Sequence, residues 1–182
     1  MLHDDELTYS VIAHTEDGVP RGVAASYRYL SAALARAYRT LGVEAGLTHR
    51  SRGPVDSGAC YLHATQADLS LGAAKLSGSA QVWSGDGVLQ HGSFVRTRDI
   101  RAESDVFRLG ERERGALAAS TATLSDAMGR VPSLEEVTQA AICAFEEVLG
   151  IEVRPGALSP DEARSAAKMR SEHTILTVSR TA

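Results

Sequence analysis

The sequence has no apolar run close to the roughly 20 residues that a membrane-spanning helix needs. Its first segment, residues 1–6, is acidic, whereas a secretory signal starts with basic residues followed by an apolar stretch. Both absences argue against an exported chain and against a membrane partner. We therefore expect a cytoplasmic protein.

Cysteine is scarce, and Cys60 and Cys143 lie far apart without the close spacing of a metal-binding pair. They do not define a disulfide framework, so each must be explained by packing or by reactivity. Cys143 falls on the apolar side of a predicted helix, and we expect it in the core. Because His49, His63 and His173 show no ligand-like spacing, we predict no metal site.

Lysine is also rare, since only Lys75 and Lys168 are lysines among the 19 basic residues. The net charge is −4 and the basic residues are spread along the chain, so a nucleic-acid backbone has no footprint here. Arginine cannot lose its proton or act as a compact single-point donor. A site that needs an ammonium group would therefore have to keep a lysine.

The length of 182 residues suits one domain with a substantial core, and we expect a single domain spanning residues 1–182. Apolar residues alternate within the first dozen positions, which predicts a strand. Through 20–41 and 133–149 they recur at spacings of three and four, which predicts two helices. The strand-like segments precede a helix-rich last third without regular alternation. This order predicts an α+β domain.

The other elements are predicted from short apolar runs and from turn residues. Residues 84–87 are expected to form the tip of a hairpin that joins two longer strands. Loops are expected at 49–58 and 105–115. The remaining strands are predicted at 43–48, 59–63, 69–71, 74–83, 87–96, 151–153 and 174–178, and the remaining helices at 116–128 and 159–170.

Small residues follow Lys75 at 77–80 and would let a ligand lie close to the backbone. The segment 89–93, Leu-Gln-His-Gly-Ser, lies on the strand expected to pair with them, and Cys60 lies upstream. A cysteine thiolate attacks an acyl thioester readily when a nearby cation such as Lys75 holds the developing oxyanion. On residue type alone, a buried structural Cys60 and a solvated Lys75 are the commoner alternatives.

The segment 75–81 together with 89–93 resembles the signature of the lipoate-protein ligase family, within the biotin and lipoate protein ligase superfamily. The resemblance implies a class II synthetase-like catalytic domain with a mixed or antiparallel sheet and flanking helices. It also implies that Lys75 donates a hydrogen bond to the carboxyl or carbonyl oxygen of a lipoyl or octanoyl group. For His91, lining the pocket and orienting the backbone are equal alternatives. The substrate-binding residues implied by the resemblance are His3, Ser77, Gly78, Ser79, Ala80, Gln81, His91 and Gly92.

The family contains two chemistries. ATP-dependent lipoate ligases activate free lipoate and need no cysteine, whereas cysteine octanoyltransferases carry octanoate from acyl carrier protein through an acyl-cysteine. Cys60, followed by 67–69 and Lys75, resembles the second arrangement, which implies Cys60 as the nucleophile. The main hypothesis is therefore an enzyme that transfers an octanoyl or lipoyl group without a cofactor. The alternative is a ligase that needs ATP and Mg, with lipoate or octanoate as the substrate group.

The partners implied by the resemblance are acyl carrier protein and lipoyl-domain proteins, namely the glycine cleavage H protein and the E2 subunits of 2-oxoacid dehydrogenases. Residues 3–10 resemble the continuation of the family's first motif, whose preceding part is an arginine followed by a Gly-Gly turn. That part does not occur in this sequence, so we expect a domain truncated at its N-terminus. A third hypothesis is therefore a non-catalytic remnant or a subunit that binds lipoyl domains.

Overall fold

The computed structural model describes residues 4–48 and 68–172. The chain divides into two compact units, of which the first ends at Glu152 and the second begins at Val153. The first unit contains all the described strands and the helices up to residue 149, and the second contains the last described helix. The single domain expected for residues 1–182 stays a prediction.

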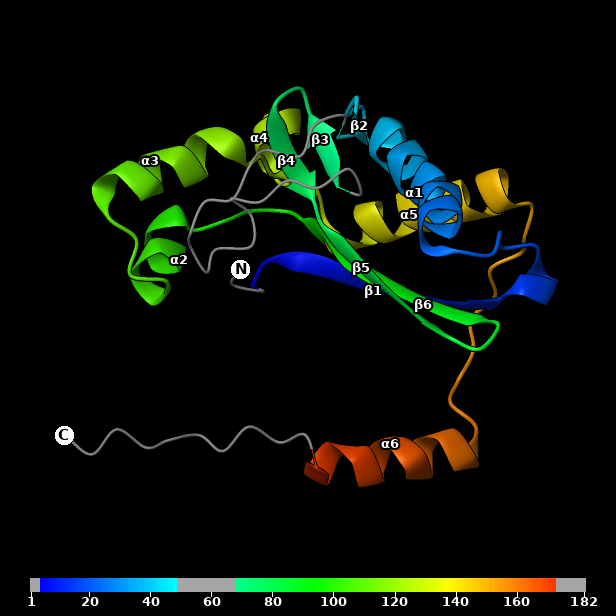
Figure 1. Cartoon of the computed structure of the whole chain (residues 1–182). Helices are drawn as coiled ribbons and strands as arrows, with labels where there is room; N and C mark the ends of the chain where they lie inside the picture. Colours follow the sequence, from blue (N-terminus) through cyan, green and yellow to red (C-terminus); the bar gives the residue numbers. More distant parts are fainter. Residues whose placement is uncertain (1–3, 49–67, 173–182) are drawn as a thin grey trace. The chain divides into compact units, whose positions relative to one another are not determined.

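Strand β6 is the centre of a three-stranded antiparallel sheet, with β1 and β5 on its two sides (Figure 1). The strands span Glu6–His14 (β1), Ser79–Ser84 (β5) and Gly87–Val95 (β6). In the turn between β5 and β6, Gly85 has a φ of 59°, which glycine adopts without strain. The hairpin predicted at this point is confirmed.

A second antiparallel sheet has the strand order β2-β3-β4, with strands at Gly46–Leu47, Leu69–Leu71 and Ala74–Ser77. The first of these is much shorter than the strand predicted at 43–48. The N–H of Val43 instead donates to the carbonyl of the preceding helix end, so this part of the segment forms a turn rather than a ladder.

The continuous strand predicted at 74–83 is wrong, because the chain passes from one sheet to the other at Gly78. The hydroxyl of Ser77 donates to the carbonyl of Ser93 over 2.9 Å, which fixes the end of β4 beside β6. The next strand then begins at Ser79 and pairs with β6 directly. A run of small residues carries no signal about which sheet each residue joins.

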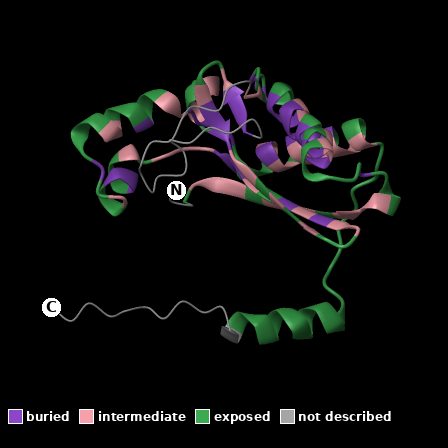
Figure 2. Ribbon diagram, viewed as in Figure 1, coloured by how far each residue is buried: buried purple, intermediate pink, exposed green. Residues whose placement is uncertain are grey.

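Helices α1 (Val23–Thr40) and α5 (Leu134–Leu149) pack against each other and against the first sheet, and Figure 2 shows the buried residues gathered between them and the strands. The Ser133 hydroxyl accepts from the N–H of Glu136 over 3.0 Å, and Gly150 ends the helix with a φ of 65°. Both predicted helices are confirmed. The largest fully buried side chains of this core are Leu34, Tyr38, Val43, Leu76, Phe94, Leu124 and Val137.

Cys143 is exposed on α5, so the prediction that it lies in the core was wrong. Val137, Ala140 and Ala144 form the buried stripe of this helix. Because each residue turns an α-helix by about 100°, Cys143 projects well to the side of that stripe. A thiol on this surface is accessible to reagents.

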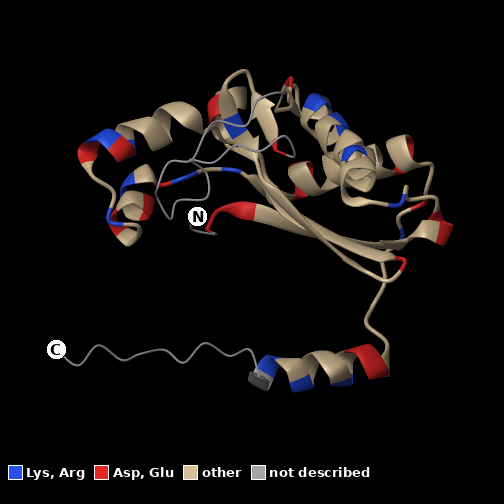
Figure 3. Cartoon of the chain, viewed as in Figure 1, with Lys and Arg blue, Asp and Glu red and all other residues tan. Residues whose placement is uncertain are grey.

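Three short helices lie between β6 and α5: α2 (Ile100–Val106), α3 (Glu111–Ser120) and α4 (Leu124–Met128). The loop predicted at 105–115 and the continuous helix predicted at 116–128 were both wrong. Helix α3 begins with charges of alternating sign at 111–114 (Figure 3), and its sequence has no apolar stripe that would predict a helix.

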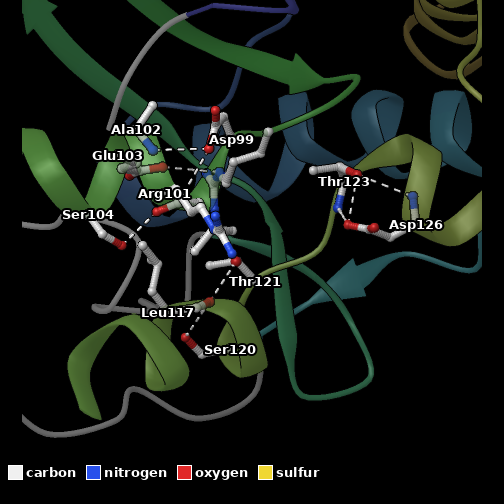
Figure 4. Close-up of polar contacts among 12 residues, drawn as sticks. Asp99, Arg101, Ala102, Glu103, Ser104, Leu117, Ser120, Thr121, Thr123 and Asp126 are labelled. Atoms are coloured by element: carbon white, nitrogen blue, oxygen red, sulfur yellow. Dashed lines mark hydrogen bonds and ion pairs between the residues drawn. The ribbon is translucent and has the colours of Figure 1, made fainter. Parts of the chain in front are cut away.

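Capping residues set the ends of these helices, as Figure 4 shows. The carboxylate of Asp99 accepts from the N–H groups of Arg101 and Ala102 over 2.8 and 3.0 Å, which starts α2. Thr123 and Asp126 form a capping box that starts α4, with the Thr123 N–H donating to the Asp126 carboxylate over 2.9 Å. The extended chain between α3 and α4 therefore separates two helices that the Ala-rich sequence suggested were one.

The second unit contains helix α6 (Pro160–Glu172), which confirms the helix predicted at 159–170. The strand predicted at 151–153 was wrong, because these residues are exposed and have no strand partner within the described part of the chain. The strands predicted at 59–63 and 174–178 lie outside the described residues. Among the helices described, none is both long and apolar enough to cross a membrane.

Candidate functional site

The second sheet holds a buried ion pair between Lys75 on β4 and Asp68 just before β3. The ammonium Nζ lies 3.0 Å from the carboxylate Oδ2, and each side chain is only 4% exposed. Two opposite charges can be buried this far only when they are paired and hydrogen-bonded, because each alone loses its hydration. A solvated Lys75, the commoner alternative for a lysine on a strand, is therefore excluded.

The backbone on both sides of this pair is fixed by hydrogen bonds. The N–H of Thr48 donates to the Asp68 carbonyl over 2.8 Å, and the N–H of Ala122 donates to the Lys75 carbonyl over 2.9 Å. Thr121 forms a parallel bridge with Lys75. The segment between α3 and α4 thus lies along β4 and holds the lysine in place.

Gly78 lies against the ion pair. A Cβ atom on Gly78 would lie 3.3 Å from Lys75 Cε, 3.4 Å from Lys75 Nζ and 3.5 Å from Asp68 Oδ1. Glycine therefore keeps this side of the pair free of a side chain at the crossing between the sheets.

Ser77 and Ser79, which the sequence assigned to substrate binding, make contacts within the protein. The Ser77 hydroxyl donates to the Ser93 carbonyl on β6. The Ser79 hydroxyl pairs with the hydroxyl of Tyr9 over 2.6 Å, and the Ser79 carbonyl accepts from the hydroxyl of Tyr27 over 3.0 Å. In this arrangement the two serines position the backbone around Gly78.

A chain of side-chain hydrogen bonds continues from Ser79 through the interior. The amide Nε2 of Gln81 donates to Oε1 of Gln90 over 3.0 Å, and Nε2 of Gln90 donates to the Tyr9 hydroxyl over 3.4 Å. The Gln81 Oε1 atom accepts from Ser26 over 2.8 Å and from the Trp83 indole over 3.1 Å. Strands β1, β5 and β6 and helix α1 are thereby joined by one polar network.

His91 and Ala80 lie on the other face of the hairpin. They are opposite each other in the β5–β6 register and both are exposed, whereas their neighbour Gln90 is buried. Successive residues of a strand point to opposite faces, so the two are not brought together with Gln81. The structure leaves His91 outside the group around Lys75.

Gly92 allows β6 to lie unusually close to the chain at the crossing. A Cβ atom on it would be 2.6 Å from the Gly78 carbonyl oxygen and 2.7 Å from the Ser79 hydroxyl. Its part in the site is therefore to permit close backbone packing. Cys60 and His3, the remaining predicted residues, lie outside the described residues.

Sequence reasoning gave no role to Asp68, Tyr9 and Tyr27, which the structure places around the lysine and Gly78. A single acidic residue before a short strand has no periodic signal. Asp68 lies in the segment 67–69 that resembles the family, but its pairing with Lys75 could have been predicted only from the rule that a buried lysine requires a counter-charge. Within the described residues, no group of three or more His, Cys, Asp or Glu side chains is arranged to hold a metal ion.

Burial raises the pKa of both tyrosines at this site. For Tyr27 the pKa rises to about 12, chiefly through loss of hydration and also through repulsion by an ionised Tyr9 and by the Asp68 carboxylate, against an opposing contribution from its hydrogen bond to Ser79. For Tyr9 the direction is the same and burial is again the main cause. Both hydroxyls stay protonated donors or acceptors at neutral pH.

We expect alkaline pH to destabilise the fold through Tyr27. Between the unfolded pKa of about 10 and the folded value of about 12, the unfolded chain loses its proton first, so the free energy of unfolding falls as the pH rises. Urea unfolding between about pH 9 and pH 12 should show a shallower decline in Tyr27→Phe than in the wild type. The matched control is Tyr29→Phe, on the same helix, and equal slopes in all three proteins would contradict the assignment.

A family model described as the lipoyl protein ligase A/B catalytic domain matches residues 1–146. An octanoyltransferase LipM of Symbiobacterium thermophilum is 33% identical over 177 residues, which cover 91% of this chain and 64% of that protein. One from Exiguobacterium sibiricum is 34% identical over 189 residues, covering 94% of this chain and 68% of its own length. The chain thus spans about two thirds of the length of these relatives.

Solved structures show the same fold. A lipoate-protein ligase A bound with ATP superposes with a TM-score of 0.72 at 22% identity, over 92% of this chain and 61% of the other. A bipartite lipoate protein ligase of Thermoplasma acidophilum, described together with its E2 lipoyl domain, also gives a TM-score of 0.72, at 20% identity over 92% and 60% of the two chains. The predicted α+β class and ligase-like architecture are confirmed.

Proposed function

The chain belongs to the lipoyl protein ligase A/B catalytic domain family, and on that premise we propose that it transfers an octanoyl or lipoyl group from acyl carrier protein to a lysine of a lipoyl domain. The observation that carries the proposal is the buried ammonium group of Lys75 beside Gly78, within a segment that matches the family's signature. The relatives named as octanoyltransferases support this choice of reaction.

The proposed reaction has two acyl transfers. In the first, the Cys60 thiolate attacks the thioester carbonyl, a bond forms between the acyl carbon and Sγ, and the carrier thiol leaves with the proton that Cys60 gave up. In the second, the amine of the lipoyl-domain lysine attacks the acyl-cysteine. An amide bond forms, the carbon–sulfur bond breaks, and the amine proton goes to the Cys60 sulfur.

Lys75 is proposed to donate to the acyl carbonyl oxygen in both steps. The negative charge that develops on this oxygen is stabilised most by a donor fixed in advance in a site that excludes water. The burial of Lys75 and the hydrogen bonds on either side of it support such a role. Gly78 places no side chain against the ammonium group, and the network from Ser79 to Gln90 holds the backbone around it.

The second candidate is an ATP-dependent lipoate ligase, favoured by the fold shared with a lipoate-protein ligase that binds ATP. A ligase would need positive charge for the nucleotide phosphates, with Mg supplied alongside. Here the ammonium of Lys75 is already matched by the Asp68 carboxylate, which supports the transferase. The third candidate is a non-catalytic subunit that binds lipoyl domains.

Mass spectrometry of the intact chain tests the function. Incubation with octanoyl-acyl carrier protein should add one octanoyl group, because the thioester is already activated and no nucleotide is needed. The adduct should be absent in Cys60→Ser. Cys143→Ser is the matched control, since it removes the exposed second thiol and should leave the adduct unchanged.

The outcomes separate the three candidates. Adenylate formation from lipoate and ATP, without an octanoyl adduct, would identify a ligase. If neither the adduct nor the adenylate forms but the chain still binds a lipoyl domain, it is a non-catalytic subunit. An adduct that survives Cys60→Ser but disappears in Cys143→Ser would place the acylated thiol on α5 and reject the proposed nucleophile.

A further inference from the structure

The backbone of Gly78, where the chain crosses from one sheet to the other, packs against the side chain of Lys75. A Cβ atom added to Gly78 would lie 3.3 Å from Lys75 Cε and 3.4 Å from Lys75 Nζ, so this backbone forms one wall of the space that the lysine occupies. Glycine has more conformational freedom than any other residue, so Gly78 does not fix this wall by itself. The position of the ammonium group therefore depends on what anchors the residues beside Gly78.

Ser79 is the neighbour of Gly78 that other elements anchor twice. The hydroxyl of Tyr27 on α1 donates to the Ser79 carbonyl over 3.0 Å, and the hydroxyls of Tyr9 on β1 and of Ser79 lie 2.6 Å apart. The bond from Tyr27 holds the main chain itself, whereas the bond to Tyr9 holds a side chain that can change its rotamer. Tyr27 therefore restrains the backbone at the crossing directly.

Tyr27 is itself held firmly in place. Its side chain is buried, and the adjacent Ser26 donates to Gln81 Oε1 over 2.8 Å, so two consecutive residues of α1 bond to β5. Burial raises the pKa of Tyr27 to about 12, so its hydroxyl remains a donor at neutral pH. The Asp68 carboxylate contributes to this rise, which shows that Tyr27 lies within electrostatic reach of the ion pair.

We propose that Tyr27 is a positioning residue for acyl transfer, because its hydrogen bond to the Ser79 carbonyl holds the crossing against Lys75 and so fixes where the ammonium group lies. The inference rests on the proposed function in one respect, namely that Lys75 donates to the acyl carbonyl. The role of Tyr27 is indirect, through Ser79 and Gly78. A displacement of about 1 Å in a catalytic group can cost about a hundredfold in rate, so a single distant hydrogen bond can matter this much.

The scarcity of lysine allows the ammonium group to be observed directly by NMR. In the full chain labelled with ¹⁵N at the lysine Nζ atoms, the side-chain signals come from Lys75 and Lys168 alone. Lys75 is buried, so its ammonium protons exchange slowly with water, whereas Lys168 lies on the exposed helix α6 and serves as the internal reference. Tyr27→Phe should shift the Lys75 signal and speed the exchange of its protons at least about threefold, with no change at Lys168.

The kinetics of octanoyl transfer provide the second reading. Tyr27→Phe should lower kcat at least about tenfold and change KM by less than about twofold, because the donor to the transition state is misplaced. Replacement of Tyr27 by para-aminophenylalanine keeps an N–H donor at the same place, and it should restore most of the rate and the Lys75 signal. Tyr29→Phe is the matched control, since it removes a hydroxyl from the same helix and should change neither reading.

The outcomes separate positioning from a purely structural role. An unchanged Lys75 signal in folded Tyr27→Phe would overturn the inference, as would a shifted signal with the wild-type rate of transfer. If Tyr27→Phe does not fold, para-fluorophenylalanine takes its place, because the fluorine fills the space of the hydroxyl without donating, and the same two changes are expected. A wild-type chain that transfers no octanoyl group would refute the proposed function itself, whereas an active wild type with an equally active Tyr27 variant would refute only the role of Tyr27.

Discussion

Lys75→Ala should lower the rate of acyl transfer by at least about a hundredfold, the size of effect seen when one fixed donor to an oxyanion is removed. Lys75→Arg should not restore the rate, because a planar guanidinium does not fit a compact single-point donor position against Gly78. The measurement is the initial rate of octanoyl transfer to a purified lipoyl domain. A variant that retains the wild-type rate would remove Lys75 from the reaction.

The same change should also destabilise the fold, and the two effects must be separated. Removal of the ammonium leaves the Asp68 carboxylate buried at 4% exposure without its ammonium partner, at a cost of about 3–5 kcal/mol. The double variant Lys75→Met with Asp68→Asn should recover most of this stability in urea unfolding but none of the transfer rate. Recovery of both together would mean that Lys75 serves the fold alone.

Gly92→Ala should cause the largest loss of stability of any single methyl group added to the hairpin. The new Cβ would lie 2.6 Å from the Gly78 carbonyl oxygen and 2.7 Å from the Ser79 hydroxyl. The first contact is with backbone and cannot be relieved by a side-chain rotation, so β5 and β6 must move apart. We expect a loss of about 3 kcal/mol in the free energy of unfolding, at the upper end of overpacking effects.

The displaced atoms belong to the chain crossing, so transfer should fall in the folded fraction of Gly92→Ala as well. Gly87→Ala is the matched control on the same strand. A Cβ there would be 3.5 Å from its nearest neighbour, the Ser84 carbonyl oxygen, which is an ordinary contact. Equal unfolding free energies for the two variants would contradict the close approach at Gly92.

The α+β class and the long helices could be predicted because their signals are local and periodic. The stripe and caps of α5 were visible in the sequence, as were the turn residues between β5 and β6. Cys143 shows the limit of such patterns, since a residue beside an apolar stripe looks much like a member of it. Helices α2 and α3 form although their charged sequences do not predict helices, because side chains cap their N-termini: Asp99 for α2 and Glu113 for α3.

The candidate site was only partly predictable for a different reason. Lys75, Gly78 and Asp68 all lie in segments that resemble the family, whereas the pairing of Asp68 with Lys75 is set by the fold. Ser79 and Gln81 were assigned to the ligand but bond to Tyr9, Gln90 and α1, since a sequence shows which polar groups exist and not which of them are satisfied internally.

The pairing of β1 with β6 has a consequence for how the molecule is made. Side-chain hydrogen bonds that accompany this pairing join residues far apart in sequence. Gln90 on β6 and Tyr9 on β1 are 81 positions apart, and Thr97 and Asp5, just beyond the ends of the two strands, are 92 positions apart. Contacts of such long range form slowly, because a large loop must close first. During synthesis, the Tyr9 hydroxyl therefore cannot bond to Gln90 until β6 has been made, so the polar network of β1, β5, β6 and α1 forms only after that strand has left the ribosome.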